Sequence, residues 1–211
     1  MDATLQGLPL NEKIINKIIK EIISINLEDN TYFEMKNVKS IKIDDEYNNY
    51  RVSLVGIVER TRINLKVDIT TGDPITPRAI TYNYPCIFEN EVINIYAYPI
   101  ETILADKYET IISRNISNTR MRDFYDIYML YKIKGKEINY QDLKKAVLNT
   151  SINRASLTII KNAKEILINI EKDNTLNKLW NNYVKDEKYV GNLQFRETIA
   201  IINKIFGKIN L

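Results

Sequence analysis

The spacing of apolar residues changes near residue 99, and this change limits the folds that the chain can adopt. Over residues 31–88 apolar and polar side chains tend to alternate, which is typical of strands with one buried face. From Pro99 onward apolar residues recur every three or four positions, as in amphipathic helices. The order of the two parts predicts an α+β fold, in which a mixed sheet with flanking helices (residues 1–98) precedes a helical C-terminal domain (residues 99–211).

Turn residues divide these parts into individual elements. The segments DDEYNNY and TTGDPITP separate candidate strands, and we expect residues 31–96 to form one mixed sheet. Asn11 predicts the start of a helix before the sheet, and Asn139 with Asp142 predicts another helix start. The predicted strands are 32–43, 50–59, 62–70, 79–88 and 92–96, and the predicted later helices are 99–114, 119–134, 139–150, 154–172, 174–186 and 193–206.

The absence of histidine narrows the chemistry that the chain can perform. It removes the usual general base, the Ser–His and Cys–His nucleophile pairs and the HExxH zinc proteases. Cys86 is the single cysteine, so an internal disulfide is impossible and a zinc site is close to excluded. The remaining groups are carboxylates, lysines, arginines and tyrosines, and carboxylates suit a hard cation such as Mg²⁺.

Two features of the whole sequence concern location and partners. The segment MDATLQGLPLNEK lacks a signal-peptide pattern and no apolar run approaches the roughly 18 residues of a membrane span, so we expect a cytoplasmic protein without a membrane partner. Residues 131–211 hold 15 basic against 8 acidic residues, a surplus of +7, while the remainder holds 15 against 19. This imbalance fits a polyanion-binding surface, but charge alone favours a lysine-rich solvated surface.

The predicted strand at residues 62–70 carries the clearest candidate for a catalytic carboxylate. Its apolar residues alternate with polar ones, so Lys66 and Asp68 project from the same, non-core face. On an inner strand Asp68 can face a cleft and bind a metal ion. Before other evidence is considered, a lysine–aspartate pair on a solvent-facing sheet surface is the favoured interpretation.

Two further candidates lie on the first two helices after the sheet. Lys107 falls within the apolar stripe of helix 99–114, where an ammonium group needs a partner or a route to solvent. It can reach into a cleft to contact phosphate, or it can extend to the edge. Asp123 lies on the apolar stripe of helix 119–134, and a structural arginine–aspartate network, with Asp126 as a member, is an equal alternative to a site role.

Three segments, in this order and spacing, resemble the AbiEii/AbiGii toxin family of the nucleotidyltransferase superfamily. They are LKVDITTGDPITP, YPIETILADKYETIISR and NTRMRDFYDIYML, and they are specific only together. The resemblance implies a nucleotidyltransferase-like core with a helical C-terminal domain, in a toxin of a bacterial toxin–antitoxin and phage abortive-infection system. It also implies Mg²⁺-dependent transfer of a nucleotide from a nucleoside triphosphate to an acceptor such as tRNA, and an antitoxin encoded nearby.

The resemblance assigns roles to particular residues. Asp68 matches the strand carboxylate, Lys107 the helical lysine and Asp123 the aspartate of the R-D-x-x-D segment, and these three are the catalytic candidates. Asp2 matches the second of two paired carboxylates, so Asp2 and Asp68 are the metal-binding candidates. Lys66 and Lys107 are the nucleotide-binding candidates, and we expect Asp68, Lys107 and Asp123 to line one cleft.

The sequence departs from the family pattern at its beginning. The first of the paired carboxylates and the glycine–serine segment have no counterpart in residues 1–211, and Asp2 is expected on a loose chain end. We therefore expect that this chain starts too late, folds, binds nucleotide weakly through Lys107 and does not transfer it. The alternatives are a non-catalytic remnant that binds nucleotide, RNA or a partner, and a helical interaction protein.

Overall fold

A computed structural model of the protein describes residues 1–8, 11–43, 47–72, 74–87 and 90–211. Part of the predicted turn DDEYNNY (Asp44, Asp45 and Glu46) and the end of one predicted strand (Phe88) lie outside the described residues. The chain divides into two compact units, Met1–Asp73 and Pro74–Leu211. The predicted domain boundary between residues 98 and 99 stays a prediction.

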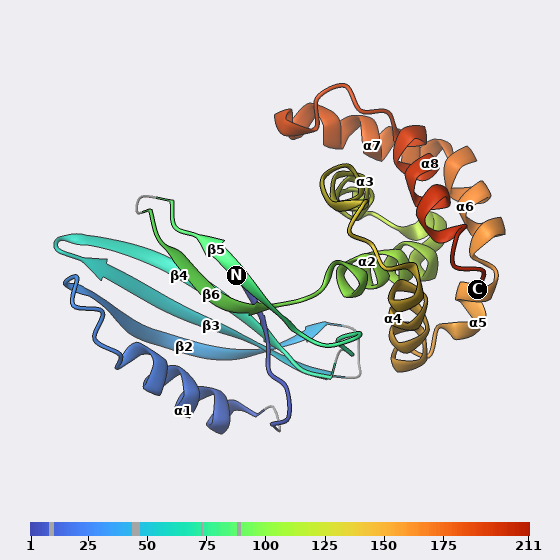
Figure 1. Ribbon diagram of the computed structural model, residues 1–211. Coiled ribbons are helices and arrows are strands. Elements are labelled where there is room, and N and C mark those ends of the chain that lie inside the picture. Colours follow the sequence, from blue (N-terminus) through green and yellow to red (C-terminus); the bar gives the residue numbers. More distant parts are fainter. Residues whose placement is uncertain (9–10, 44–46, 73, 88–89) are drawn as a thin grey trace. The chain divides into compact units, whose positions relative to one another are not determined.

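The first unit is a four-stranded mixed sheet with one helix packed against it (Figure 1). Its elements are β1 (Asp2–Thr4), α1 (Glu12–Ile23), β2 (Thr31–Ile43), β3 (Tyr47–Val58) and β4 (Thr61–Thr70). The strand order is β1-β4-β3-β2, with β1 parallel to β4 and the other pairs antiparallel. Helix α1 begins as predicted, because the side chain of Asn11 accepts a hydrogen bond from the N–H of Ile14 at 2.9 Å.

The packing of α1 determines which face of the sheet remains for a site. Ile15 and Ile19 of the helix are buried against strand residues Tyr50, Val52, Leu54 and Ile69. Successive residues of a strand point to opposite faces. Arg51, Lys66 and Asp68 therefore project from the face that α1 does not cover.

The second unit begins with a β-hairpin that is separate from the larger sheet. The hairpin consists of β5 (Ile80–Pro85) and β6 (Val92–Ala97), which pair only with each other among the described residues. The expectation of one sheet over residues 31–96 is therefore wrong, because in the described part of the chain β5 and β6 pair with each other and not with a strand of the larger sheet. The inner position of β4 in the larger sheet is confirmed.

Helices make up the rest of the second unit and confirm the α+β class (Figure 1). They share one core that includes Leu104, Phe124, Ile127, Trp180 and Ile199. The helices are α2 (Ile100–Arg114), α3 (Met121–Lys134), α4 (Tyr140–Asn153), α5 (Leu157–Lys161), α6 (Ala163–Lys172), α7 (Asn174–Asp186) and α8 (Phe195–Phe206), with short 3₁₀ turns η1 (Asn115–Ser117) and η2 (Lys188–Val190).

Two details of these helices test the sequence predictions. Asn139 caps α4 as predicted, since its side chain accepts hydrogen bonds from the N–H groups of Gln141 and Asp142 at 3.0 and 3.3 Å. The prediction of a single helix at 154–172 is wrong, because the helix is interrupted at Asn162, which separates α5 from α6. None of the helices among the described residues is long and apolar enough to cross a membrane.

Candidate functional site

Strand β1 brings a second carboxylate next to Asp68. The parallel register pairs Asp2 directly with Asp68, and paired residues of neighbouring strands project from the same face. The N–H of Asp68 donates to the carbonyl oxygen of Met1 at 2.9 Å. The N–H of Leu5 donates to the carbonyl oxygen of Thr70, also at 2.9 Å. The expectation of a loose chain end at Asp2 is therefore wrong, because these bonds tie both ends of β1 to β4.

Arg51 on β3 contacts Asp68 from the opposite side. The two residues are directly opposite in the antiparallel register, and Nε and Nη2 of the guanidinium donate to the two carboxylate oxygens, each at 2.7 Å. Both side chains retain access to water, with exposed fractions of 45% for Arg51 and 27% for Asp68. The hydrogen bonds from Arg51 hold the pKa of the Asp68 carboxyl group below its usual range.

A row of charged side chains thus crosses the sheet at one level. Lys39 on β2 pairs in register with Arg51, so the order across the four strands is Asp2, Asp68, Arg51 and Lys39. Lys66 lies on the same face, two residues before Asp68, and both lysines are exposed. Carboxylates at one end of the row and cations at the other suit a metal-bound polyanion. We call Asp2, Asp68, Arg51 and Lys39 the sheet row.

Sequence reasoning missed Arg51 and Lys39. Arg51 occupies a polar position in the alternating segment YRVSLVGIV, which is the only signal that could have drawn attention to it. Alternation shows which face a residue occupies but does not show which residue of another strand lies opposite. The pairing register supplies that information.

The Arg51–Asp68 pair predicts how the protein responds to acid. Because the folded-state pKa of Asp68 is lowered, its stabilising contribution is present above the unfolded-state pKa of about 3.9 and is lost as the pH falls through the folded-state pKa. In Arg51→Gln we expect the Asp68 pKa to rise toward its ordinary value, so this contribution disappears. NMR titration of the Asp68 carboxyl carbon measures the change. An identical pKa in both proteins would show that Arg51 does not hold the carboxylate.

A second charged cluster joins α2 to α3. Nζ of Lys107 lies 3.2 Å from Oδ1 of Asp123 and 2.6 Å from Oδ2 of Asp126. Nε of Arg120 lies 2.9 Å from Oδ2 of Asp123, and Nε of Arg122 lies 3.8 Å from Oδ2 of Asp126. The Asp123 side chain is 4% exposed and that of Lys107 is 22% exposed. The arginine–aspartate network, which was one of two alternatives for Asp123 in the sequence analysis, is therefore present, and it includes Lys107. We call these five residues the helical cluster.

The helical cluster retains unused hydrogen-bonding capacity. Oδ2 of Asp123 is buried and accepts no hydrogen bond from the described residues, because Arg120 approaches it at ion-pair distance without hydrogen-bond geometry. The Lys107 ammonium has three donors and uses two of them on Asp123 and Asp126. Counting the partners among the described residues, one N–H of Lys107 is thus available for a phosphate oxygen.

The sheet row and the helical cluster belong to different units of the chain. Asp2 is placed beside Asp68 in the first unit, and Lys107 contacts Asp123 in the second. The expectation that Asp68, Lys107 and Asp123 line one cleft stays a prediction.

The two carboxylates of the sheet row fit a magnesium ion in number and kind. Within the parts of the chain that the structure describes, no three or more histidine, cysteine, aspartate or glutamate side chains are grouped to hold a metal. Mg²⁺, however, commonly takes one or two carboxylates and completes its shell with water and substrate phosphate oxygens. Arg51 occupies both oxygens of Asp68, so a metal ion would share these oxygens with the guanidinium or displace it.

Fold and charge pattern together define a class of protein. It is an α+β protein with strand carboxylates and cations on the sheet face that α1 does not cover, an arrangement suited to metal-bound phosphates. The chain belongs to the AbiEii family, described as the nucleotidyl transferase AbiEii toxin of type IV toxin–antitoxin systems, whose sequence model matches residues 1–200. The resemblance predicted from the three segments is thereby confirmed.

Two solved structures from Helicobacter pylori are similar to the chain. A candidate nucleotidyltransferase is 16% identical, and the match covers 84% of this chain and 67% of that chain with a TM-score of 0.36. The protein JHP933 is 18% identical, and the match covers 84% of this chain and 65% of that chain with a TM-score of 0.36. The chain therefore spans about two thirds of the length of these proteins. No curated protein matches it.

Proposed function

We propose that the chain forms part of a metal-dependent nucleotidyltransferase, which transfers a nucleotide from a nucleoside triphosphate to an acceptor such as tRNA. Membership of the AbiEii family supports the type of reaction. The observation that carries the proposal is the register of β1 against β4, because it sets two carboxylates side by side on a face that also carries cations. In this proposal the protein is a cytoplasmic toxin whose antitoxin is encoded nearby.

The position of each charged residue supports a particular role. Asp2 and Asp68 would hold Mg²⁺, which neutralises charge on the triphosphate and on the departing pyrophosphate. Lys66 and Lys107 would contact phosphate oxygens as point charges. Asp123 orients Lys107 through their 3.2 Å ion pair and leaves one ammonium N–H for phosphate.

The ion pair of Arg51 with Asp68 supports one alternative function. In it the protein binds nucleotide, RNA or a partner and catalyses no transfer. Its guanidinium already neutralises Asp68 through both carboxylate oxygens. If this pair is permanent, the sheet row holds no metal, and phosphates are contacted by Lys39 of the row and by Lys66 beside it. Residues 1–211 also include only one of the two paired carboxylates that the family resemblance implies.

A labelling assay separates the two functions. Residues 1–211, and a form extended by the in-frame upstream codons, are incubated with Mg²⁺, each labelled nucleoside triphosphate and bulk tRNA. We expect labelled RNA with the extended form only, because the reaction depends on metals and cations that neutralise developing charge, and residues 1–211 hold one paired carboxylate. Robust labelling by residues 1–211 would contradict the expected inactivity. A lack of labelling with either form would favour the binding function.

A further inference from the structure

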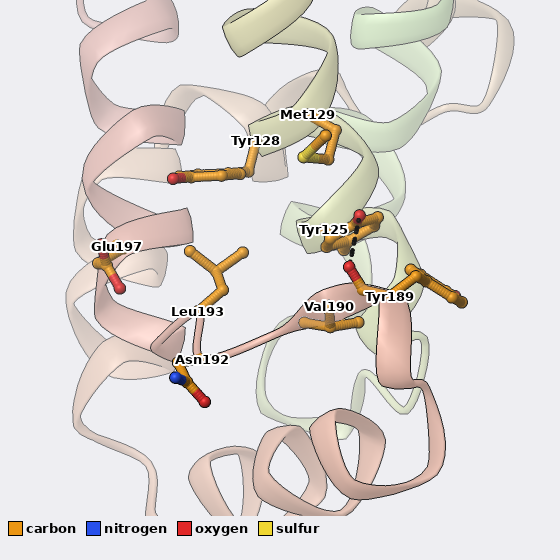
Figure 2. Close-up of a pocket in the computed structure, with 8 residues that line it drawn as sticks. All are labelled: Tyr125, Tyr128, Met129, Tyr189, Val190, Asn192, Leu193 and Glu197. Carbon is orange, nitrogen blue, oxygen red and sulfur yellow. Dashed lines mark hydrogen bonds between the residues drawn. The ribbon is translucent and has the colours of Figure 1, made fainter.

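A pocket of the second unit has three tyrosines in its lining (Figure 2). Tyr125 and Tyr128 come from α3, Tyr189 from η2 and Glu197 from α8, around a volume of about 370 Å³. Leu193 lies between these side chains in Figure 2. The rings are accessible, since Tyr189 is 56% exposed and the other two tyrosines are half-buried. The pocket therefore presents aromatic surface to a ligand.

Contacts within the same unit hold this aromatic surface in place. Tyr125 lies edge-on to Tyr189 with ring centroids 5.3 Å apart, and its hydroxyl donates to the carbonyl oxygen of Tyr189 at 3.5 Å. The hydroxyls of Tyr183 and Tyr189 share a hydrogen bond of 2.9 Å. Nε1 of the buried Trp180 donates to the carbonyl oxygen of Leu193 at 2.9 Å. A surface that is already ordered loses less conformational entropy when it binds a ligand.

A second pocket, of about 570 Å³, adjoins the first and shares Asn192 and Leu193 with it. Asn181 and Lys185 line it from one face of α7, four residues apart, and Arg196 lines it from α8. In the part of the chain that the structure describes, the side chains of Asn181, Lys185, Asn192 and Arg196 make no hydrogen bond or ion pair. Their donors and acceptors are therefore available to a ligand.

We propose that the two pockets together bind single-stranded RNA. Proteins that bind single strands combine aromatic rings that stack on bases, amides that hydrogen-bond base edges and cations that contact phosphates. The pockets hold all three kinds of group, with tyrosine rings in the first, amides in both and the cations Lys185 and Arg196 in the second. Glu197 also lines the first pocket, and its carboxylate accepts a hydrogen bond from the N–H of Gln194. Two adjoining pockets suit consecutive nucleotides of one strand. The inference rests on the proposed function in one respect: the bound RNA is the acceptor of the transferred nucleotide.

Fluorescence anisotropy tests the proposal without any transfer reaction. Residues 1–211 are titrated against a labelled single-stranded RNA of about 12 nucleotides, in buffer with EDTA and without nucleoside triphosphate. We expect Tyr128→Ala and Tyr189→Ala each to weaken binding about fivefold or more through lost stacking. Tyr128→Phe keeps the ring and removes a hydroxyl that makes no hydrogen bond within the described residues, so it should bind as the unchanged protein does.

Charge variants in the same assay examine the phosphate contacts. Lys185→Gln and Arg196→Gln should each lower the slope of log affinity against log salt by about one, as expected for the loss of one phosphate contact. Lys164→Gln on α6 removes an exposed charge of the same unit from outside the pockets, and Tyr96→Ala on β6 removes a tyrosine that is 85% exposed. Both controls should leave affinity and salt slope unchanged.

Two results would overturn the proposal. One is an RNA affinity that stays the same in all pocket variants. The pockets would then be a contact site for a protein partner or simply the edge of the helical core. The other is an equal loss in Tyr96→Ala and Lys164→Gln, which would show binding by charge at no particular place. Thermal unfolding of each variant confirms that it is folded. A failure of RNA binding would leave the metal-binding role of Asp68 untouched, because the assay contains no divalent metal.

Discussion

Replacing Asp68 by asparagine is expected to abolish nucleotidyl transfer and toxicity while the protein remains folded. In the form of the protein that transfers nucleotide, the change removes a charged oxygen from the proposed Mg²⁺ site beside Asp2. A metal ion contributes several kcal/mol of charge stabilisation to such a transition state, and each 1.36 kcal/mol is a factor of ten in rate. We therefore expect a loss of at least about a hundredfold in the rate of RNA labelling.

The stability of this variant should change little. Asp68 also loses its ion pair with Arg51, but both side chains are partly exposed, and such pairs contribute about 0–1 kcal/mol. Glu34→Gln is the matched control, because it breaks another exposed ion pair on the same sheet, between Glu34 and Arg62, outside the sheet row. Growth arrest and labelling at unchanged levels in Asp68→Asn would refute the catalytic role of Asp68. Equal losses in Glu34→Gln would assign the effect to the sheet as a whole.

Replacing Lys107 by methionine is expected to lower the free energy of unfolding by about 2–3 kcal/mol. The variant leaves the nearly buried Asp123 and the neighbouring Asp126 without the ammonium group that lies between them. Removing one partner of a fully buried pair costs about 3–5 kcal/mol, and the value is smaller here because Lys107 is partly exposed and Arg120 still approaches Asp123. Urea denaturation measures the change.

A second substitution identifies the cause of this loss. In Lys107→Met with Asp126→Asn, one of the two facing carboxylates is neutral, so part of the stability should return. Lys134→Met, which breaks the exposed pair with Glu137, should change the free energy of unfolding by less than about 0.5 kcal/mol. A similar, small effect of Lys107→Met would mean that the helical cluster does not hold α2 and α3 together.

Nucleotide binding by the same variants tests the prediction that Asp68 and Lys107 act on one ligand. If Lys107 and Asp68 act on one triphosphate, the losses in Lys107→Met and Asp68→Asn should not add in the double variant, because the two residues then share a partner. Isothermal titration with a nucleoside triphosphate and Mg²⁺ measures the four affinities. Strict additivity would place the two residues at independent positions.

Patterns confined to a few neighbouring residues could be predicted from the sequence. The helix starts at Asn11 and Asn139 depend on hydrogen bonds to residues two or three positions further along, so the local sequence contains all of their determinants. The α+β class follows from the change in apolar spacing, since that spacing reflects the period of each element. Asp68, Lys107 and Asp123 are site candidates because of three segments whose order and spacing are properties of the sequence alone.

Tertiary structure alone decided which side chains meet. Alternation placed Asp68 on a polar face, but the register of β1 and β3 gave it Asp2 and Arg51 as neighbours. The packing of α2 against α3 likewise set Lys107 between Asp123 and Asp126. Many registers and packing arrangements satisfy the same apolar pattern, and the choice among them depends on the sum of contacts between segments far apart in the chain. A local pattern therefore specifies the face that a residue occupies, whereas its partners depend on how the whole unit packs.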